Sequence, residues 1–335
     1  MNDLPLALTL GEPAGIGPEI TVKAKRILKN ECPFFVVGDY NFLTTIAQKY
    51  NLQTKKIDCP ADTFLHLDKL CIIDQALTQR VNPGHISGQN SATVPENIRK
   101  ALSYVQNKQA SAIVTNPINK WALKQNSKFE FDGHTDYLAS MDKNNKTSVM
   151  MLANNDGFRV VPVTIHVPIN QVSKTLTQEL IKSTILTLNE GLKFDFKIKH
   201  PKILVTGLNP HAGESTAMGF EEIDVIKPAM ESLIRMGLNL VGPVAADTAF
   251  TEKNRSIFDT IVCMYHDQAL IPIKMISFDE CINITLGLSF VRTSPDHGTA
   301  LDIAGNGTAN PNSLICAIQE AHKLSSIRSF DAKKA

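Results

Sequence analysis

Short apolar runs alternate with segments of helical periodicity along most of the chain, and this alternation constrains the fold more than any other feature. Residues 6–10 and 34–38 are strand-like, and a helical pattern follows at residues 41–50. The same order recurs at residues 91–107 (helix), 112–115 (strand), 202–205 (strand), 221–236 (helix) and 260–265 (strand). Strands that alternate with helices predict a mostly parallel sheet, so the expected fold class is α/β.

Four other segments carry more specific predictions. Residues 64–73 suggest further short strands. Residues 149–152 and 159–165 are β-rich runs that a turn could pair as a hairpin, and residues 169–192 have the pattern of one long helix.

Composition limits the classes of function. The chain has 335 residues, 43% hydrophobic and 20% charged, which is ordinary for a globular protein large enough for two domains. A net charge of +1 gives no global attraction to nucleic acid or membranes, and the apolar runs are too short to span a bilayer. The N-terminus lacks the basic start of a signal peptide, and six scattered cysteines form no C-x-x-C motif. We therefore expect reduced thiols in a cytoplasmic protein.

Residues 289–311, SFVRTSPDHGTALDIAGNGTANP, form a long stretch with little apolar periodicity. Gly298, Gly305 and Gly307 would let its backbone approach a ligand closely. Asn310 suits the N-cap and Pro311 the first residue of a following helix, whose N-terminus favours anions. The stretch is predicted to be a ligand-binding loop, and the alternative is an irregular surface connection.

Three histidines occur at the ends of predicted strands. His166 ends VVPVTIH, His211 follows ILVTGLNP, and His266 follows TIVCMY. Ligands of open α/β sheets bind outside the carboxyl ends of the strands, and neutral imidazole is a common metal ligand, so these residues predict a divalent metal site. Each could instead be a hydrogen-bonded structural residue. Asp247 and Asp267 are candidates to orient the rings, although they could equally cap turns or helices.

Two cations suggest an anion site. Lys274 lies in the apolar, strand-like run IPIKMISF, and Arg292 opens the 289–311 stretch. Arginine suits carboxylate and phosphate recognition. The alternatives are a lysine that only extends its amine to solvent and an arginine that only pairs with Asp296.

The segment GEPAGIGPEI, residues 11–20, connects the first strand to a helix. It opens a βα unit but lacks the G-x-G-x-x-G spacing of the usual dinucleotide fingerprint. Its sequence leaves open whether it is a plain tight turn or a turn against a ligand.

Six motifs together carry a family resemblance. They are GEPAGIGPEI, DGHTDYLA, NPHAGE, GPVAADTAF, YHDQALIPIK and TLGLSFVRTSPDHGTALDIAG. Over residues 6–325 the chain resembles the 4-hydroxythreonine-4-phosphate dehydrogenase family of vitamin B6 biosynthesis, and GIGPEI and HGTALDIAGNGTANP look like the wider isocitrate and isopropylmalate dehydrogenase fold. The resemblance implies a cofactor-binding α/β domain of residues 1–125 and 285–335, and a metal-binding and dimerisation α/β domain of residues 126–284, with a cleft between them.

The resemblance also assigns roles. Metal ligands fall on His166, His211 and His266, supplied by both subunits of a homodimer. Substrate contacts fall on His134, Thr135, Lys274, Asn283 and Arg292, of which Asn283 has no signal of its own. Contacts to the dinucleotide fall on His297, Gly298, Asp302, Gly305 and Asn310. A Lys or Asp near the metal is the expected general base, so the candidate catalytic residues are Lys274, Asp247 and Asp267.

The substrate implied is a phosphorylated hydroxy-amino acid, 4-phosphooxy-L-threonine. Oxidation by NAD would give a β-keto acid that loses CO2 to form 3-amino-2-oxopropyl phosphate, for the synthesis of pyridoxine 5′-phosphate. One divalent metal ion is expected per site. Histidine ligands favour zinc first and then cobalt, and magnesium, which oxygen ligands suit better, is the third candidate. Asp302 would bond a ribose 2′-hydroxyl and repel a 2′-phosphate, so we expect NAD rather than NADP, although family members use both.

Alternative functions are open at this point. A paralogue could act on 4-phospho-threonate or 4-phospho-erythronate. A metal- and nucleotide-binding protein without catalysis would be expected to lack one of the metal-ligating residues. All three histidines are present, which argues against it. A hydrolase or aldolase with a three-histidine metal site needs no site for adenosine, so the HGTALDIAG segment argues against this alternative.

Overall fold

A computed structural model of the chain describes residues 4–127, 129–131, 133–142 and 147–332. It divides into two compact units, the first of Met1–Asp142 and Ser289–Ala335 and the second of Lys143–Leu288. The boundaries expected from the sequence lay after residues 125 and 284. The first falls later because helix α6 packs on the first unit, where the hydroxyl of Tyr137 donates to the carbonyl of Pro95 at 3.2 Å.

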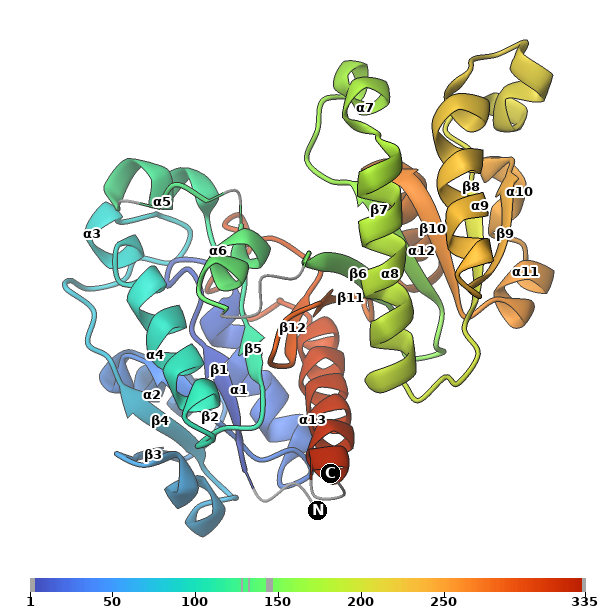
Figure 1. Ribbon diagram of the computed structural model, residues 1–335. Helices are drawn as coiled ribbons and strands as arrows, with labels where there is room; N and C mark the ends of the chain where they lie inside the picture. The colour runs from blue at the N-terminus through green and yellow to red at the C-terminus, as the bar shows by residue number, and fades with distance from the viewer. Residues whose placement is uncertain (1–3, 128, 132, 143–146, 333–335) are drawn as a thin grey trace. The chain divides into compact units, whose positions relative to one another are not determined.

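The first unit has a sheet of parallel strands (Figure 1). In spatial order its strands are β3 (Thr54–Lys56), β4 (Leu70–Asp74), β2 (Phe34–Gly38), β1 (Leu6–Thr9), β5 (Ile113–Thr115) and β12 (Arg292–Pro295). The central strands β1 and β2 are buried along their whole length, in keeping with their largely apolar sequences, LALT and FFVVG, in a sheet covered on both faces. The predicted parallel α/β architecture is confirmed in this unit.

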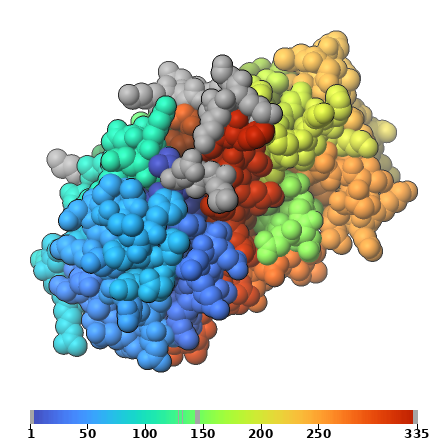
Figure 2. Space-filling view, turned by 90° about the horizontal axis from the view of Figure 1, so that it is seen from below, coloured from blue at the N-terminus to red at the C-terminus, as the bar shows by residue number. Residues whose placement is uncertain are grey.

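Helices connect these strands. They are α1 (Gly17–Leu28), α2 (Tyr40–Lys49), α3 (Gly88–Ser91), α4 (Val94–Gln106), α5 (Lys120–Asn126), α6 (His134–Ser140) and α13 (Asn312–Ala332), with a short 3-10 helix at Pro60–Leu65. Helix α4 packs against β1, β2 and β5, whereas α13 packs against β5, β12 and α1. Figure 2 shows the C-terminal segment, in red, beside the N-terminal segment, in blue. The two ends of the chain therefore build one unit together.

The second unit has a mixed sheet. In spatial order its strands are β11 (Ile282–Leu286), β6 (Val149–Ala153), β7 (Arg159–Thr164), β10 (Thr260–Tyr265), β8 (Lys202–Thr206) and β9 (Asn239–Val244). Strand β6 is antiparallel to both neighbours, and the other pairs are parallel. The predicted hairpin is confirmed, since β6 pairs with β7 across a turn closed by Gly157 N–H to Asn154 C=O at 3.1 Å.

The helices of the second unit follow the same strand-to-helix alternation. They are α7 (Ile169–Thr175), α8 (Gln178–Phe194), α9 (Lys227–Arg235), α10 (Ala246–Ala249), α11 (Glu252–Ile257) and α12 (His266–Ser277), with an irregular 3-10 segment at Pro210–Thr216 and a π-helix at Glu222–Ile226 that leads into α9. A core that includes Leu152, Val160, Ile261 and Ile273 lies between the sheet and its helices. None of the helices in the described part of the chain combines the length and apolar character needed to cross a membrane.

Four predictions of local structure are wrong. The helix expected at 169–192 is broken, because Leu176 is extended and the Thr177 side chain accepts from Leu180 N–H to cap α8. Residues 64–73 hold one strand, β4, because a 3-10 helix takes the start of the segment.

The other two concern the predicted anion site. Lys274 lies in helix α12 rather than in a strand, although that helix contains Pro272. The 289–311 stretch is not all loop, because Arg292–Pro295 forms buried strand β12 beside β5.

Candidate active site

The second unit brings the predicted metal ligands to one edge of its sheet. Strands β7, β10 and β8 are parallel neighbours. His166 lies just beyond β7, His266 opens α12 directly after β10, and His211 lies in the turn after β8. The ring centroids of His166 and His266 are 5.9 Å apart. The shared strand-end position expected from the sequence is therefore observed for all three.

Two of these histidines have unusual backbone conformations. His166 has φ 49° and His211 has φ 52°, in the left-handed region that costs most residues about 1–3 kcal/mol. The strain at His211 extends through the next residues, since Ala212, Glu214 and Ser215 also have positive φ. Such conformations concentrate at ligand sites, where the surrounding structure fixes a side chain in place.

The residues present fit a metal ion only in part within one chain. Two imidazoles that share an ion at about 2.1 Å have centroids roughly 5–6 Å apart, as His166 and His266 do. Across the described residues of a single chain, no group of three or more His, Cys, Asp or Glu side chains could hold a metal ion. His166 and His266 would therefore form an incomplete set that needs a further ligand.

The candidate catalytic residues lie around these histidines. Oδ1 of Asp267 is 3.0 Å from Nδ1 of His266, the contact that a ring-orienting carboxylate makes. Asp247 is exposed in α10, a short helix that packs against the turn carrying His211. Lys274 is part-buried two turns along α12, with Nζ 5.9 Å from the ring centroid of Phe278. Asn283, which sequence patterns did not single out, lies on β11 opposite Leu152.

The first unit holds a buried cation beside a neutral imidazole. Arg292 is 3% exposed, and its Nη2 donates to Oγ1 of Thr115 at 2.8 Å. Burial lowers the pKa of Arg292 to about 10, with Asp296 opposing the shift, so the guanidinium stays charged near neutral pH. Burial and the nearby charges of Arg292 and Lys120 hold the pKa of His134 well below its usual range. A cation and a neutral ring donor together suit an anionic group of a ligand.

One atom of this pair points to a ligand. Nε2 of His134 is buried and has no hydrogen-bond partner within the described structure. Buried polar atoms almost always have a partner, so an unpaired one marks a position for a ligand or water. Thr135 follows His134 in the first turn of α6. Asp132, part of the same sequence motif, lies outside the described residues.

The shifted pKa of His134 predicts a pH dependence of stability. A histidine whose pKa is lowered on folding binds fewer protons in the folded state than in the unfolded state. The free energy of unfolding therefore decreases as the pH falls below the unfolded pKa of about 6.5. We expect the unfolding free energy of the wild type to decline more between about pH 7 and pH 5 than that of His134→Gln. Urea unfolding at several pH values measures this, with exposed His200→Gln as the control. Equal slopes for wild type and His134→Gln would contradict the burial argument.

The predicted dinucleotide segment is an ordered turn structure. Gly305 and Gly307 have φ of 81° and 77°, a conformation that glycine adopts without strain. Nδ1 of His297 lies 3.0 Å from the carbonyl of Gly298. Asp302 is exposed, and the carboxamide of Asn310 accepts from Asn312 N–H at 3.0 Å. Helix α13 begins at Asn312, one residue later than the start predicted at Pro311, whose carbonyl accepts from Ile315 N–H.

A pocket of about 590 Å³ adjoins this segment, and sequence patterns did not predict it. It lies beyond the carboxyl ends of β1, β2 and β4, and Gly305 is part of its wall. Its size is within the range of small-molecule sites. Its charged and aromatic lining residues include Glu19, Asp39, Phe42, Lys49, Tyr50 and Arg80. The sequence feature that could have indicated this pocket is the polar residue Asp39 directly after the apolar run FFVVG.

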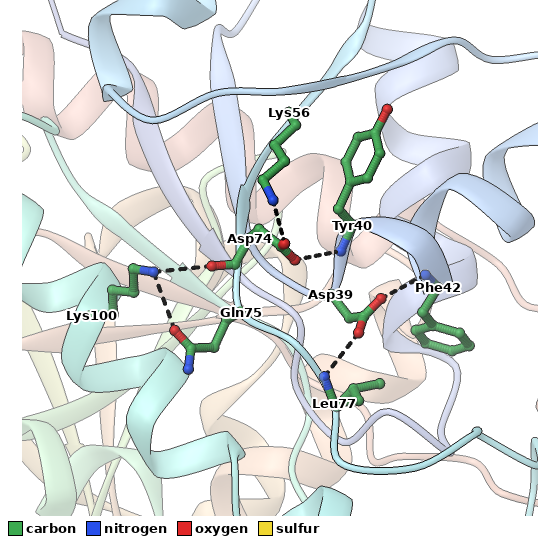
Figure 3. Close-up of polar contacts among 8 residues, drawn as sticks. All are labelled: Asp39, Tyr40, Phe42, Lys56, Asp74, Gln75, Leu77 and Lys100. Atoms are coloured by element: carbon green, nitrogen blue, oxygen red, sulfur yellow. Dashed lines mark hydrogen bonds and ion pairs between the residues drawn. The ribbon is translucent and has the colours of Figure 1, made fainter.

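Hydrogen bonds at two strand ends hold segments that line this pocket or adjoin its lining residues (Figure 3). The carboxylate of Asp39, after β2, accepts from Phe42 N–H at 2.7 Å and from Leu77 N–H at 2.8 Å. At the end of β4, Asp74 accepts from Tyr40 N–H at 3.0 Å and from Lys56 Nζ at 2.7 Å. Both carboxylates therefore hold protein groups around the pocket.

The chain matches known proteins over nearly its whole length. Residues 30–321 match the family model described as pyridoxal phosphate biosynthetic protein PdxA. The chain belongs to the PdxA family. It is 41% identical over 332 residues to 4-hydroxythreonine-4-phosphate dehydrogenase of Methylorubrum extorquens, covering 96% of this chain and 95% of that protein. It is 43% identical over 319 residues to the enzyme of that name in Roseobacter denitrificans, covering 95% and 96%.

Solved structures agree with this membership. The crystal structure of 4-hydroxythreonine-4-phosphate dehydrogenase from Klebsiella pneumoniae matches with a TM-score of 0.84 at 34% identity, over 96% of this chain and 99% of that one. A terephthalate 1,2-cis-dihydrodiol dehydrogenase from Burkholderia xenovorans matches with a TM-score of 0.62 at 26% identity, over 96% and 98%. The family resemblance, the α/β fold and the assignment as a dehydrogenase are thereby confirmed for this PdxA member.

Proposed function

We propose that this PdxA member oxidises 4-phosphooxy-L-threonine with NAD in a metal-dependent reaction. The product β-keto acid then loses CO2 to give 3-amino-2-oxopropyl phosphate, a precursor of pyridoxine 5′-phosphate. The observation that carries the proposal is the full-length similarity to enzymes named for this substrate. The buried Arg292 and the unpaired ring nitrogen of His134 support it, because the substrate brings a phosphate and a carboxylate.

Within this proposal the chain's own residues bind and orient the substrate. Arg292, His134, Thr135, Lys274 and Asn283 are the residues proposed to hold its anionic ends. Arg292 keeps its charge, and His134 in its neutral form donates a hydrogen bond without adding charge.

His166, His211 and His266 are the residues proposed to hold one divalent metal ion, zinc first, with cobalt or magnesium next. When bound, it would supply a Lewis acid that lowers the pKa of the substrate hydroxyl. Asp267 orients the His266 ring through the contact at 3.0 Å, and the proton of the hydroxyl passes to a general base among Lys274, Asp247 and Asp267.

The segment containing His297, Gly298, Asp302, Gly305 and Asn310 is proposed to hold the dinucleotide, which supplies the hydride acceptor. Asn310 accepts a hydrogen bond from the backbone N–H of Asn312 at the start of α13, whereas the carboxylate of Asp302 is exposed to solvent. It would accept a bond from a ribose 2′-hydroxyl and repel a 2′-phosphate, which favours NAD over NADP.

We propose a cytoplasmic homodimer with a metal site shared between subunits. Helix α12, which begins with His266, leaves apolar side chains exposed: Ile271 is 58% exposed, Met275 82% and Phe278, just after it, 68%. These residues are spaced by about one helical turn and form one stripe. A second subunit that covered this stripe would lie on the helix that starts at the metal site. None of the six cysteines, which all lie among the described residues, forms a disulfide and five of them are buried, in keeping with a reducing compartment.

The decisive experiment is NADH formation from 4-phosphooxy-L-threonine, measured with and without a chelator. We expect activity that the chelator abolishes, and faster initial rates with NAD than with NADP. A panel that includes 4-phospho-threonate and 4-phospho-erythronate separates the proposal from a paralogue's activity, since a higher kcat/KM for either would replace the proposed substrate. A preference for NADP would contradict the role given to Asp302.

A further inference from the structure

Helix α1 holds the predicted dinucleotide segment by its backbone. The carboxylate of Glu19 accepts from the N–H of Gly307 at 3.3 Å and from the N–H of Ala309 at 3.1 Å. The ammonium of Lys23 donates to the carbonyls of the same two residues, at 2.9 Å to Gly307 and 2.7 Å to Ala309. Two side chains one turn apart therefore occupy both backbone groups of Gly307 and of Ala309.

The two side chains also bind each other. Nζ of Lys23 lies 2.7 Å from Oε1 of Glu19, and the side chains are only 17% and 7% exposed. A buried pair is favourable only when further hydrogen bonds satisfy both charges, which the backbone of 307 and 309 does here. Tyr50 covers the pair, with Lys23 Nζ 5.6 Å from its ring centroid. We refer to Glu19 and Lys23, with their bonds to 307 and 309, as the α1 clamp.

The same segment is held at other points. The carbonyl of Thr299 accepts from Ile16 N–H at 3.0 Å, at the turn before α1. A Cβ on Gly84 would lie 2.8 Å from the carbonyl of Leu301, and one on Gly305 would lie 2.7 Å from Cβ of Pro83. Contacts from the protein itself therefore hold this backbone at residues 299, 301, 305, 307 and 309.

We propose that Glu19 and Lys23 are positioning residues that set the backbone of residues 305–309 before the dinucleotide binds. The assignment of this segment to the dinucleotide rests on the proposed function, whereas the clamp itself rests on the contacts above. Glu19, Tyr50 and Gly305 line the 590 Å³ pocket, so the clamp also fixes one wall of that pocket. A segment ordered in advance binds its ligand without an ordering cost, so the clamp acts on binding rather than on the chemical step.

The first test is backbone amide hydrogen exchange of the full-length protein without cofactor. Glu19→Gln keeps the size of the side chain but loses the charge that both N–H groups bond. We expect the amides of Gly307 and Ala309 to exchange about tenfold faster than in the wild type. The matched control is Glu231→Gln on α9, which removes the carboxylate of a solvent-exposed pair with Arg235, also one helical turn apart. This control should leave exchange at 307 and 309 unchanged.

The second test separates the clamp from an ordinary helix ion pair. The swap Glu19→Lys with Lys23→Glu keeps opposite charges one turn apart on α1. It also turns an ammonium toward two N–H groups and a carboxylate toward two carbonyls, so the bonds to the segment are lost. We expect the swap and Glu19→Gln both to raise KM for NAD about tenfold, with kcat within about twofold of the wild type. Thermal midpoints confirm that each variant is folded.

Three outcomes would overturn the proposal: unchanged exchange in Glu19→Gln, faster exchange with an unchanged KM for NAD, or a swap variant that behaves like the wild type. The exchange experiment uses no cofactor, so it decides whether the clamp holds the segment independently of the proposed function. A wild-type protein that reduces no NAD would overturn the proposed function instead.

Discussion

Replacing Arg292 with methionine is expected to lower kcat/KM for 4-phosphooxy-L-threonine about a hundredfold, because hydrogen bonds to a charged group contribute about 1.5–3 kcal/mol. The guanidinium is buried and charged, so no solvent-exposed cation can replace it. Steady-state kinetics with varied substrate measure the loss, which should fall mainly on KM if the residue binds substrate and transition state alike.

A series of variants separates binding from folding. Arg292→Lys keeps the charge but lacks the planar fork, so its loss should be intermediate. Thr115→Val removes the hydroxyl that Nη2 of Arg292 contacts at 2.8 Å while leaving the cation, and its loss should be smaller than that of Arg292→Lys. Thermal midpoints show whether each variant is folded. A folded Arg292→Met that keeps kcat/KM within threefold of the wild type would remove Arg292 from the substrate site.

Most of the strand framework could be predicted because buried parallel strands are continuous apolar runs. Strands β1, β2 and β10 are buried along nearly their whole length, and their sequences contain few polar residues. The positions of His166, His211 and His266 followed from this framework, since a residue that follows a parallel strand lies at the ligand-binding edge of the sheet.

The errors arose where tertiary contacts decide local structure. Strand β12 contains the charged residue Arg292 and the polar residues Thr293 and Ser294, so it has no apolar signal, yet pairing with β5 buries it. Lys274 sits in an apolar sequence typical of a strand, and the helix forms although Pro272 interrupts it. The α1 clamp could not be predicted from the sequence either, because Glu19 and Ala309 are separated by 290 positions in the chain. Local patterns contain no information about such pairs.

The largest effect is expected from loss of the proposed metal ligands. Alanine at His166, His211 or His266 should remove bound metal and lower kcat on the order of a thousandfold, because a Lewis acid contributes several kcal/mol to a transition state that develops negative charge. Metal analysis of protein purified without chelator measures the first quantity and NADH formation the second. His166 and His211 are exposed, so neither substitution creates a core cavity. An alanine variant that kept both metal and rate would exclude that residue as a ligand.

If the chain forms the proposed homodimer, mixed dimers test which subunit supplies each proposed metal ligand. His166 and His266 lie together in one chain, and no third candidate ligand joins them among its described residues, so His211 should come from the partner. Subunits with His211→Ala mixed with subunits with His166→Ala would then rebuild one complete site in each mixed dimer. Random exchange should restore roughly a quarter of wild-type activity. His166→Ala mixed with His266→Ala is the matched control and should restore none, because both losses fall on the same half-site. Restoration by the control pair, or by no pair, would contradict this division of the site.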